Sequence, residues 1–259
     1  MSPDIATKAM AAARDAAGAA AEILRHYWHR GVEIEIKSDA TPVTIADREA
    51  EQAIRKILQA ALPQAAIYGE EFGLEGTRGG LLWLVDPLDG TKSFVRRTPF
   101  FSTQIALMEG EELVLGVSSA PIYGETLWAS RGEGAWLDGE RVGAADTRAI
   151  GQASISIGNV KTLTADARWD VLGQLIRDSN RIRGYGDFCH YHLLARGSLD
   201  LVIESDVNIL DIAALAVIVR EAGGVFTDLD GGPVTLDTRS VLAGTPAIHA
   251  QALDRLRQR

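Results

Sequence analysis

The sequence predicts a mixed α/β (α+β) fold with two or more layers of helices and strands. The chain opens with a long stretch of helical periodicity, a block of strand-like runs follows, and the second half alternates the two patterns. Hydrophobic residues make up 46% and charged residues 24% of the 259 residues, which is typical of a globular chain. The length suits one large or two modest domains, and we expect a division into 1–145 and 146–259.

The first half is expected to hold two helices and then a series of strands. Apolar residues recur at spacings of three and four over residues 4–27, which is the period of one helix face. A second helix is expected to begin near Thr44 and to end before Pro63. The strand-like runs cover residues 32–36, 66–68, 81–85, 102–108, 112–119 and 125–129.

The second half repeats both patterns in alternation. Strands are expected over residues 152–158, 199–204 and 225–227. Helices are expected over residues 165–178, 188–196 and 212–222. The last of these helices should end at Gly223-Gly224, because glycine readily adopts the backbone conformation that terminates a helix.

Charge and cysteine content exclude several classes of protein. The 26 Lys and Arg residues against 35 Asp and Glu residues give a net charge of −9 with no basic stripe, so nucleic-acid binding is not expected. No apolar segment approaches the roughly 20 residues of a membrane span, and charged residues interrupt the Ala-rich start, unlike a signal peptide. Cys189 is the only cysteine, which fits a reducing compartment. We therefore expect a soluble, cytoplasmic protein.

Residues suited to catalysis gather after the buried run 81–85. The run continues as Asp86-Pro87-Leu88-Asp89-Gly90-Thr91. The proline and the glycine predict a sharp corner between a strand that ends at Asp86 and a short helix that begins at Thr91. Two carboxylates can hold cations there, and the free N–H groups of a helix start can hold an anion, so the corner predicts a metal-dependent phosphate site. The hexapeptide alone is equally compatible with an ordinary turn.

Three further positions add acids, each with a structural alternative. Glu70-Glu71 follows the short strand 66–68, and these two acids can either bind a metal or simply be solvated. Asp211 lies at the start of an apolar helix, which it can cap. Asp47 completes a capping-box pattern that starts at Thr44. Only the ensemble of these acids favours a metal site.

Several motifs together resemble the inositol monophosphatase family, in its order and spacing, over about residues 10–250. They are Lys37-Ser38-Asp39, Thr41-Pro42-Val43-Thr44, Ala46-Asp47, Gly69-Glu70-Glu71-Phe72-Gly73, Trp83-Leu84-Val85-Asp86-Pro87-Leu88-Asp89-Gly90-Thr91-Lys92-Ser93-Phe94, Asp211-Ile212-Ala213-Ala214 and Glu221-Ala222-Gly223-Gly224. Within the family, Arg183-Gly184-Tyr185-Gly186-Asp187-Phe188 is similar to the histidinol-phosphatase branch. Leu210 departs from the family, which usually has Trp at that position, and we expect this to affect substrate fit more than hydrolysis.

The resemblance implies an αβαβα layered sandwich, dependence on two or three Mg²⁺ ions and a homodimer. It implies that Glu70, Asp86 and the carbonyl of Leu88 bind one metal, that Asp86, Asp89 and Asp211 bind a second, and that Glu70 also reaches a third ion through water. It further implies that the amides of Gly90 and Thr91 hold the phosphate, that Asp47 and Thr91 orient or deprotonate the attacking water, and that Glu204, with Gly186 and Asp187, meets the leaving alcohol.

The expected reaction is hydrolysis of a phosphate monoester by a metal-activated water, because an all-oxygen ligand set suits Mg²⁺. The acids Asp187 and Glu204 favour a cationic amino alcohol, so we expect L-histidinol phosphate as substrate and a place in histidine biosynthesis. A helix N-cap is the structural alternative for Asp187. Alternative substrates are myo-inositol 1-phosphate and sugar or nucleotide phosphates, and an inactive metal-binding scaffold is the remote alternative.

Covalent phosphatase chemistry is not expected. Arg196 lies one position too far from Cys189 for the Cys-x5-Arg loop of cysteine phosphatases. His190 and His192 should point to different sides of one helix, which makes them core or surface residues and not a pair of metal ligands.

Overall fold

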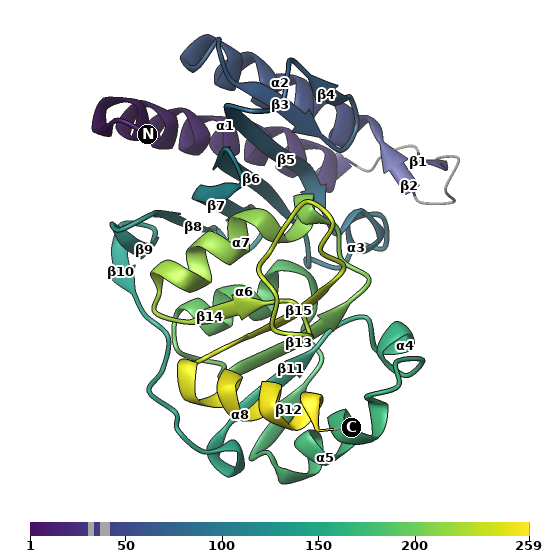
Figure 1. The fold of residues 1–259 in the computed structure, drawn as a ribbon. Coiled ribbons are helices and arrows are strands. Elements are labelled where there is room, and N and C mark those ends of the chain that lie inside the picture. Colours follow the sequence, from purple (N-terminus) through teal and green to yellow (C-terminus); the bar gives the residue numbers. More distant parts are fainter. Residues whose placement is uncertain (31–33, 37–41, 259) are drawn as a thin grey trace.

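The computed structural model describes residues 1–30, 34–36 and 42–258, and it has the αβαβα layers that were expected (Figure 1). The helices α1 (Pro3–Arg30) and α2 (Ile45–Ala61) cover one face of an eight-stranded sheet. The helices α6 (Asp187–Ala195) and α7 (Ile209–Glu221) lie between this sheet and a five-stranded one. The outer face of the second sheet is covered by α5 (Trp169–Asp178) and α8 (Pro246–Arg257).

The central strands β5 (Leu81–Asp89) and β6 (Ser102–Glu109) of the larger sheet have both faces buried. The strands of this sheet, in spatial order, are β10 (Glu140–Val142), β9 (Gly134–Leu137), β8 (Glu125–Ser130), β7 (Glu112–Ala120), β6, β5, β3 (Ala66–Gly69) and β4 (Gly73–Glu75). In β5, Trp83 and Val85 pack under α1 and α2, whereas Leu82 and Leu84 pack on the side of α7. Because alternate side chains enter two different cores, the strand is apolar throughout.

The smaller sheet has the strand order β12 (Arg181–Arg183), β11 (Ser154–Ile157), β13 (Leu201–Ser205), β15 (Ser240–Gly244) and β14 (Val225–Thr227). The short elements outside the two sheets are β1 (Ile34–Ile36), β2 (Pro42–Thr44), α3 (Thr91–Val95), the 3₁₀ helix η1 (Ile150–Gln152) and α4 (Val160–Leu163). The predicted strand at 32–36 is described only from Ile34, and the motif residues Lys37-Ser38-Asp39 and Thr41 lie outside the described residues. The expected division after residue 145 falls between β10 and η1 and stays a prediction.

The helix predicted over 165–178 is wrong in its first turn, because α5 begins only at Trp169. The carboxylate of Asp166 accepts the backbone N–H of Arg168 at 2.8 Å and also binds its guanidinium at 2.7 Å. This local pairing stabilises a turn in place of a helix. No element was predicted at β2, β4, β9, β10, β12, β15, η1, α4 or α8.

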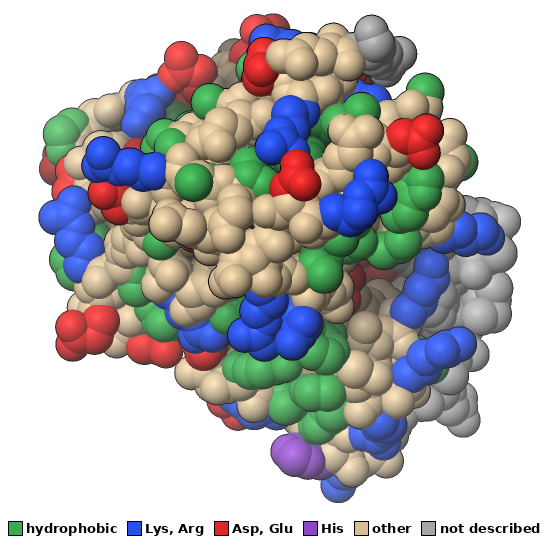
Figure 2. Space-filling view, turned by 90° about the horizontal axis from the view of Figure 1, so that it is seen from below, with side chains coloured by type: hydrophobic (Ala, Val, Ile, Leu, Met, Phe, Trp, Pro, Cys, Tyr) green, Lys and Arg blue, Asp and Glu red, His purple; other side chains and the backbone are tan. Residues whose placement is uncertain are grey.

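Two surface expectations can be compared with the structure. Within the described part of the chain, no helix has the length and apolarity needed to cross a membrane. On the face seen from below, the described Lys and Arg side chains are scattered among acidic, hydrophobic and other residues (Figure 2).

Candidate active site

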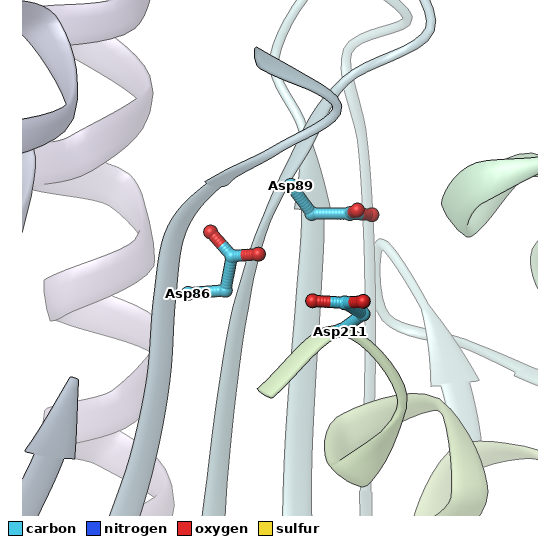
Figure 3. Close-up of side chains that lie close together, drawn as sticks. All are labelled: Asp86, Asp89 and Asp211. Atoms are coloured by element: carbon cyan, nitrogen blue, oxygen red, sulfur yellow. The ribbon is translucent and has the colours of Figure 1, made fainter. Parts of the chain in front are cut away.

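Strand β5 presents two carboxylates on the same face because its pairing contains a bulge. Asp86 lies opposite Gln104 of β6, and Asp89 lies opposite Ser102, so β5 has one extra residue between them. In a regular strand, residues three apart point to opposite faces, and the extra residue reverses the alternation. Leu88 packs in the core under α1 and α2. Asp86 and Asp89 therefore both point to the side of α7 (Figure 3).

The predicted corner after β5 lies three residues later than expected, because the strand continues to Asp89. Pro87 is tolerated within it because β3 ends opposite Val85, and one edge of β5 is unpaired beyond that point. The chain then turns at Gly90, whose φ of +87° suits glycine. A Cβ on Gly90 would also lie 2.5 Å from the carbonyl oxygen of Phe100. Helix α3 begins at Thr91, as predicted.

Asp211 serves both the helix and the site. It is the third residue of α7 and accepts the backbone N–H of Asn208 at 2.9 Å, while the Asn208 side chain accepts the N–H of Leu210. The predicted capping role is therefore confirmed. The same carboxyl group faces the two acids of β5, and ligand atoms of Asp86, Asp89 and Asp211 all lie within 4.8 Å of one another (Figure 3).

Asp47 likewise caps its helix, α2, and contacts a residue of the site. Its Oδ2 accepts the backbone N–H of Thr44 at 2.8 Å and the Thr44 hydroxyl at 2.6 Å, which confirms the predicted capping box. Its Oδ1 lies 3.2 Å from the Thr91 hydroxyl, which is also 3.0 Å from the carbonyl oxygen of Leu88. The structure thus brings together Asp47 and Thr91, the expected pair for the attacking water, and places the Leu88 carbonyl beside them.

Glu70 lies on the turn after β3, beside Asp86, and its charge and hydrogen bonding contribute to raising the pKa of Asp86. Within the described residues, the tight triad comprises the three aspartates, and Glu70 stands next to it as a more exposed fourth acid. The two expected metal-binding groups, one with Glu70 and one with Asp211, are therefore adjacent and share Asp86.

Burial and mutual repulsion shape the protonation of these acids. Burial, followed by the neighbouring carboxylates, raises the pKa of Asp86 and of Asp89 well above the usual range. Burial likewise raises the pKa of Asp211 to about 7, although the N–H of Asn208 opposes the shift. Such a cluster is stable in ionised form only when positive charge is added. Its oxygen-only donors fit a hard divalent cation such as Mg²⁺.

The second half of the chain adds two more acids to this region. A small pocket is lined by Asp89, Asp211, Asp187, Glu204, Asn159 and Tyr191, together with apolar residues of α7. Burial and the charge of Glu204 raise the pKa of Asp187 to about 6, while His190 and Lys92 oppose the shift. The N-cap interpretation of Asp187 is wrong: Gly186 holds the N-cap position of α6, and Asp187 is its first residue.

Two residues of β6 that were not predicted support the Asp89 carboxylate. The Ser102 hydroxyl donates to Oδ2 of Asp89 at 3.2 Å, and the Gln104 side-chain amide donates to Ser102 at 2.8 Å. Both side chains are fully buried in β6. The available signal was a polar Ser-Thr-Gln run at the start of an otherwise apolar strand, since buried polar groups need partners.

The two histidines of α6 lie in the core and point to different sides, as predicted. His190 contacts Ser156 and Glu204, whereas His192 contacts Ser118 at 2.7 Å. Neither histidine belongs to the aspartate triad.

The layered fold, with an oxygen-only cluster of acids between its layers, defines a metal-dependent phosphatase. The chain belongs to the inositol monophosphatase family, whose model matches residues 6–259. It is therefore a phosphoric monoester hydrolase that acts on small phosphorylated substrates.

Individual relatives cover most of the chain. A histidinol-phosphatase from Streptomyces coelicolor is 39% identical over 237 residues, covering 88% of both chains. An inositol-1-monophosphatase from Caulobacter vibrioides is 35% identical over 234 residues, covering 87% of this chain and 91% of the relative. The structure of an inositol monophosphatase from Zymomonas mobilis has a TM-score of 0.84 at 30% identity, covering 95% of this chain and 96% of that one.

Proposed function

We propose that the protein is a Mg²⁺-dependent phosphomonoesterase that hydrolyses L-histidinol phosphate to L-histidinol and phosphate. The observation that carries this proposal is the pair Asp187 and Glu204, which lines the same pocket as Asp89 and Asp211. Histidinol has an ammonium group and an imidazole, and both can donate hydrogen bonds to carboxylates. Inositol offers hydroxyl groups but no cation. The similarity to a histidinol-phosphatase from Streptomyces coelicolor supports the same choice.

Two or three Mg²⁺ ions would be held by the acids at the end of β5 and their neighbours. Glu70, Asp86 and the Leu88 carbonyl would hold one ion, and Asp86, Asp89 and Asp211 a second. Glu70 would reach a third through water. When bound, the ions would lower the pKa of a water, neutralise the phosphate and stabilise the leaving alkoxide.

The chain's own groups would orient the attack. The Thr91 hydroxyl lies between Asp47 and the Leu88 carbonyl, so a water held near Thr91 can pass its proton toward Asp47. Burial raises the pKa of Asp47, which makes it a better proton acceptor than an exposed carboxylate. The amides of Gly90 and Thr91 would hold the phosphate at the corner after β5.

The alternative substrate is myo-inositol 1-phosphate, supported by the inositol-1-monophosphatase from Caulobacter vibrioides. Other sugar or nucleotide phosphates and an inactive metal-binding scaffold are the further alternatives. The family resemblance also supports a homodimer, which light scattering of the purified protein would test.

The test is release of inorganic phosphate in Mg²⁺, with L-histidinol phosphate and myo-inositol 1-phosphate compared at matched low concentrations. The proposal expects a clear preference for L-histidinol phosphate and loss of release in EDTA. A preference for inositol phosphate would keep the metal chemistry and reject the role of the acid pair. Absence of release from any phosphate monoester would favour the scaffold.

A further inference from the structure

His190 is a fully buried histidine that the proposed reaction does not use directly. It lies in the second turn of α6, three residues after Asp187, and has no exposed surface. Its Nε2 atom is 3.0 Å from Oε2 of Glu204, the acid that lines the leaving-group side of the pocket. Buried polar side chains need hydrogen-bond partners, and one partner of His190 is Glu204, which lines the pocket.

The hydrogen bonds around His190 indicate which ring nitrogen donates to Glu204. The backbone N–H of Tyr185 donates to the Ser156 hydroxyl at 3.1 Å, so the Ser156 oxygen is used as an acceptor. The same Ser156 oxygen lies 3.4 Å from Nδ1 of His190. Because a carboxylate oxygen only accepts, the contact with Oε2 of Glu204 places a ring proton on Nε2 of His190, which donates it to Glu204.

Glu204 is held from two further directions. The Tyr191 hydroxyl donates to the same Oε2 atom at 2.7 Å. The second oxygen, Oε1, lies against Gly158, where a Cβ would overlap with it. Two donors on one oxygen and close packing at the other leave the carboxylate a single orientation. The chain from Tyr185 through Ser156 and His190 also links this carboxylate to the segment that precedes Asp187.

We propose that His190 is a positioning residue for substrate specificity, which fixes the Glu204 carboxylate so that it selects a leaving alcohol carrying a positive charge. This inference rests on the proposed function, in which Glu204 meets the leaving alcohol. Loss of the Nε2 donor frees the carboxylate to rotate, and a misplaced carboxylate loses its directed bond to the ammonium or imidazole of the substrate. The metal and phosphate side of the site is untouched by this change.

The test compares two substrates, L-histidinol phosphate and 4-nitrophenyl phosphate, which carries no cation. His190→Leu is expected to raise KM for L-histidinol phosphate about tenfold, with kcat and the rate with 4-nitrophenyl phosphate within about twofold of wild type. His190→Gln places an amide donor near the position of Nε2 and is expected to restore most of the KM. Tyr191→Phe removes the other donor to Oε2 and provides the same test if His190→Leu fails to fold.

His192→Leu is the matched control, because His192 is equally buried in the same helix but contacts Ser118 on the other side. It should lower the melting temperature without changing the ratio of kcat/KM for the two substrates. Equal losses on both substrates in His190→Leu, or the same change of ratio in His192→Leu, would overturn the inference. If the wild-type protein shows no preference for L-histidinol phosphate, the proposed function itself is overturned. If the wild-type preference is present and survives in both His190→Leu and Tyr191→Phe, only the positioning role of His190 is overturned.

Discussion

Glu51 of α2 accepts the backbone N–H of Glu71 through Oε2 at 2.7 Å. The Glu51 carboxylate is fully buried and pairs with Arg55 at 2.7 Å, and the Arg55 guanidinium donates in turn to the carbonyl of Gly73 at 2.6 Å. This ion pair therefore holds the turn that carries Glu70 at Glu71 and at Gly73. Glu70, which lies beside Asp86, is thus supported by a helix that contributes no member of the aspartate triad.

Glu51→Ala is expected to destabilise the protein by about 3 kcal/mol, because it leaves Arg55 without its buried partner. It should also raise the Mg²⁺ concentration for half-maximal activity several-fold, because the turn with Glu70 loses its support. Urea unfolding and a Mg²⁺ titration measure the two effects. Glu22→Ala is the control, since Glu22 pairs with Arg25 on the surface of α1 and should change neither quantity noticeably. An unchanged Mg²⁺ requirement in Glu51→Ala would contradict the second expectation.

Asp89→Asn is expected to lower turnover by more than about a hundredfold, because it removes the charge of a proposed metal ligand while keeping the size of the side chain. Phosphate release measures the effect, and calorimetry with Mg²⁺ should show weaker binding. Asp15→Asn changes an exposed acid on α1 and should leave both measurements unchanged. Near-normal activity of Asp89→Asn would reject the assigned site.

Asp187→Asn is expected to reduce kcat/KM for L-histidinol phosphate by about ten- to a hundredfold, the effect of losing one charge-assisted hydrogen bond. The rate with 4-nitrophenyl phosphate should change little. Asparagine is chosen because Asp187 has a φ of +46°, which asparagine tolerates. Asp206→Asn is the matched control, with an exposed aspartate at a φ of +58°. Equal losses on both substrates would remove Asp187 from substrate recognition.

The stability of the metal-free protein should fall as the pH rises from about 4 to about 7. The folded state raises the pKa of Asp211 to about 7 and of Asp187 to about 6, and raises those of Asp86 and Asp89 as well. An acid whose pKa is raised by folding stabilises the fold below its unfolded value, about 3.9, and this contribution is lost as the pH passes the folded value.

Mg²⁺ favours the ionised acids, so it should restore the stability that is lost at higher pH. The increase in melting temperature on adding Mg²⁺ is expected to be larger at about pH 8 than at about pH 5. Thermal unfolding of EDTA-treated protein with and without Mg²⁺ provides the comparison, and Asp89→Asn should reduce the increase at the higher pH. An increase of the same size at both pH values would contradict the expected coupling.

Much of the fold was predictable because its central elements have strong periodicity. The helix predicted over 4–27 is found as α1, and the run 102–108 is found as β6, since both bury a continuous apolar face. The strands β10 and β12 were missed because three-residue strands at a sheet edge carry little pattern.

The site was predictable in its residues but not in its geometry. The acids of the hexapeptide were found from their spacing and the family resemblance, but the bulge that places Asp86 and Asp89 on one face depends on pairing with β6. The roles of Ser102 and His190 likewise depend on contacts between residues far apart in the sequence, which no local pattern records.

The capping boxes of α2 and α7 restrict the substitutions that this protein can accept during evolution. In both Asp47 and Asp211, a side-chain oxygen accepts a backbone N–H at the start of a helix, and the same carboxyl group faces the site. A substitution that removes either side chain therefore weakens a helix and, in the proposed mechanism, the chemistry as well, and selection for a stable protein alone would act against it. Asparagine is the exception, since it can still accept the bond at the helix start while it removes the negative charge. Aspartate-to-asparagine exchange is thus the easiest route by which a lineage of this protein would keep its shape and abandon catalysis.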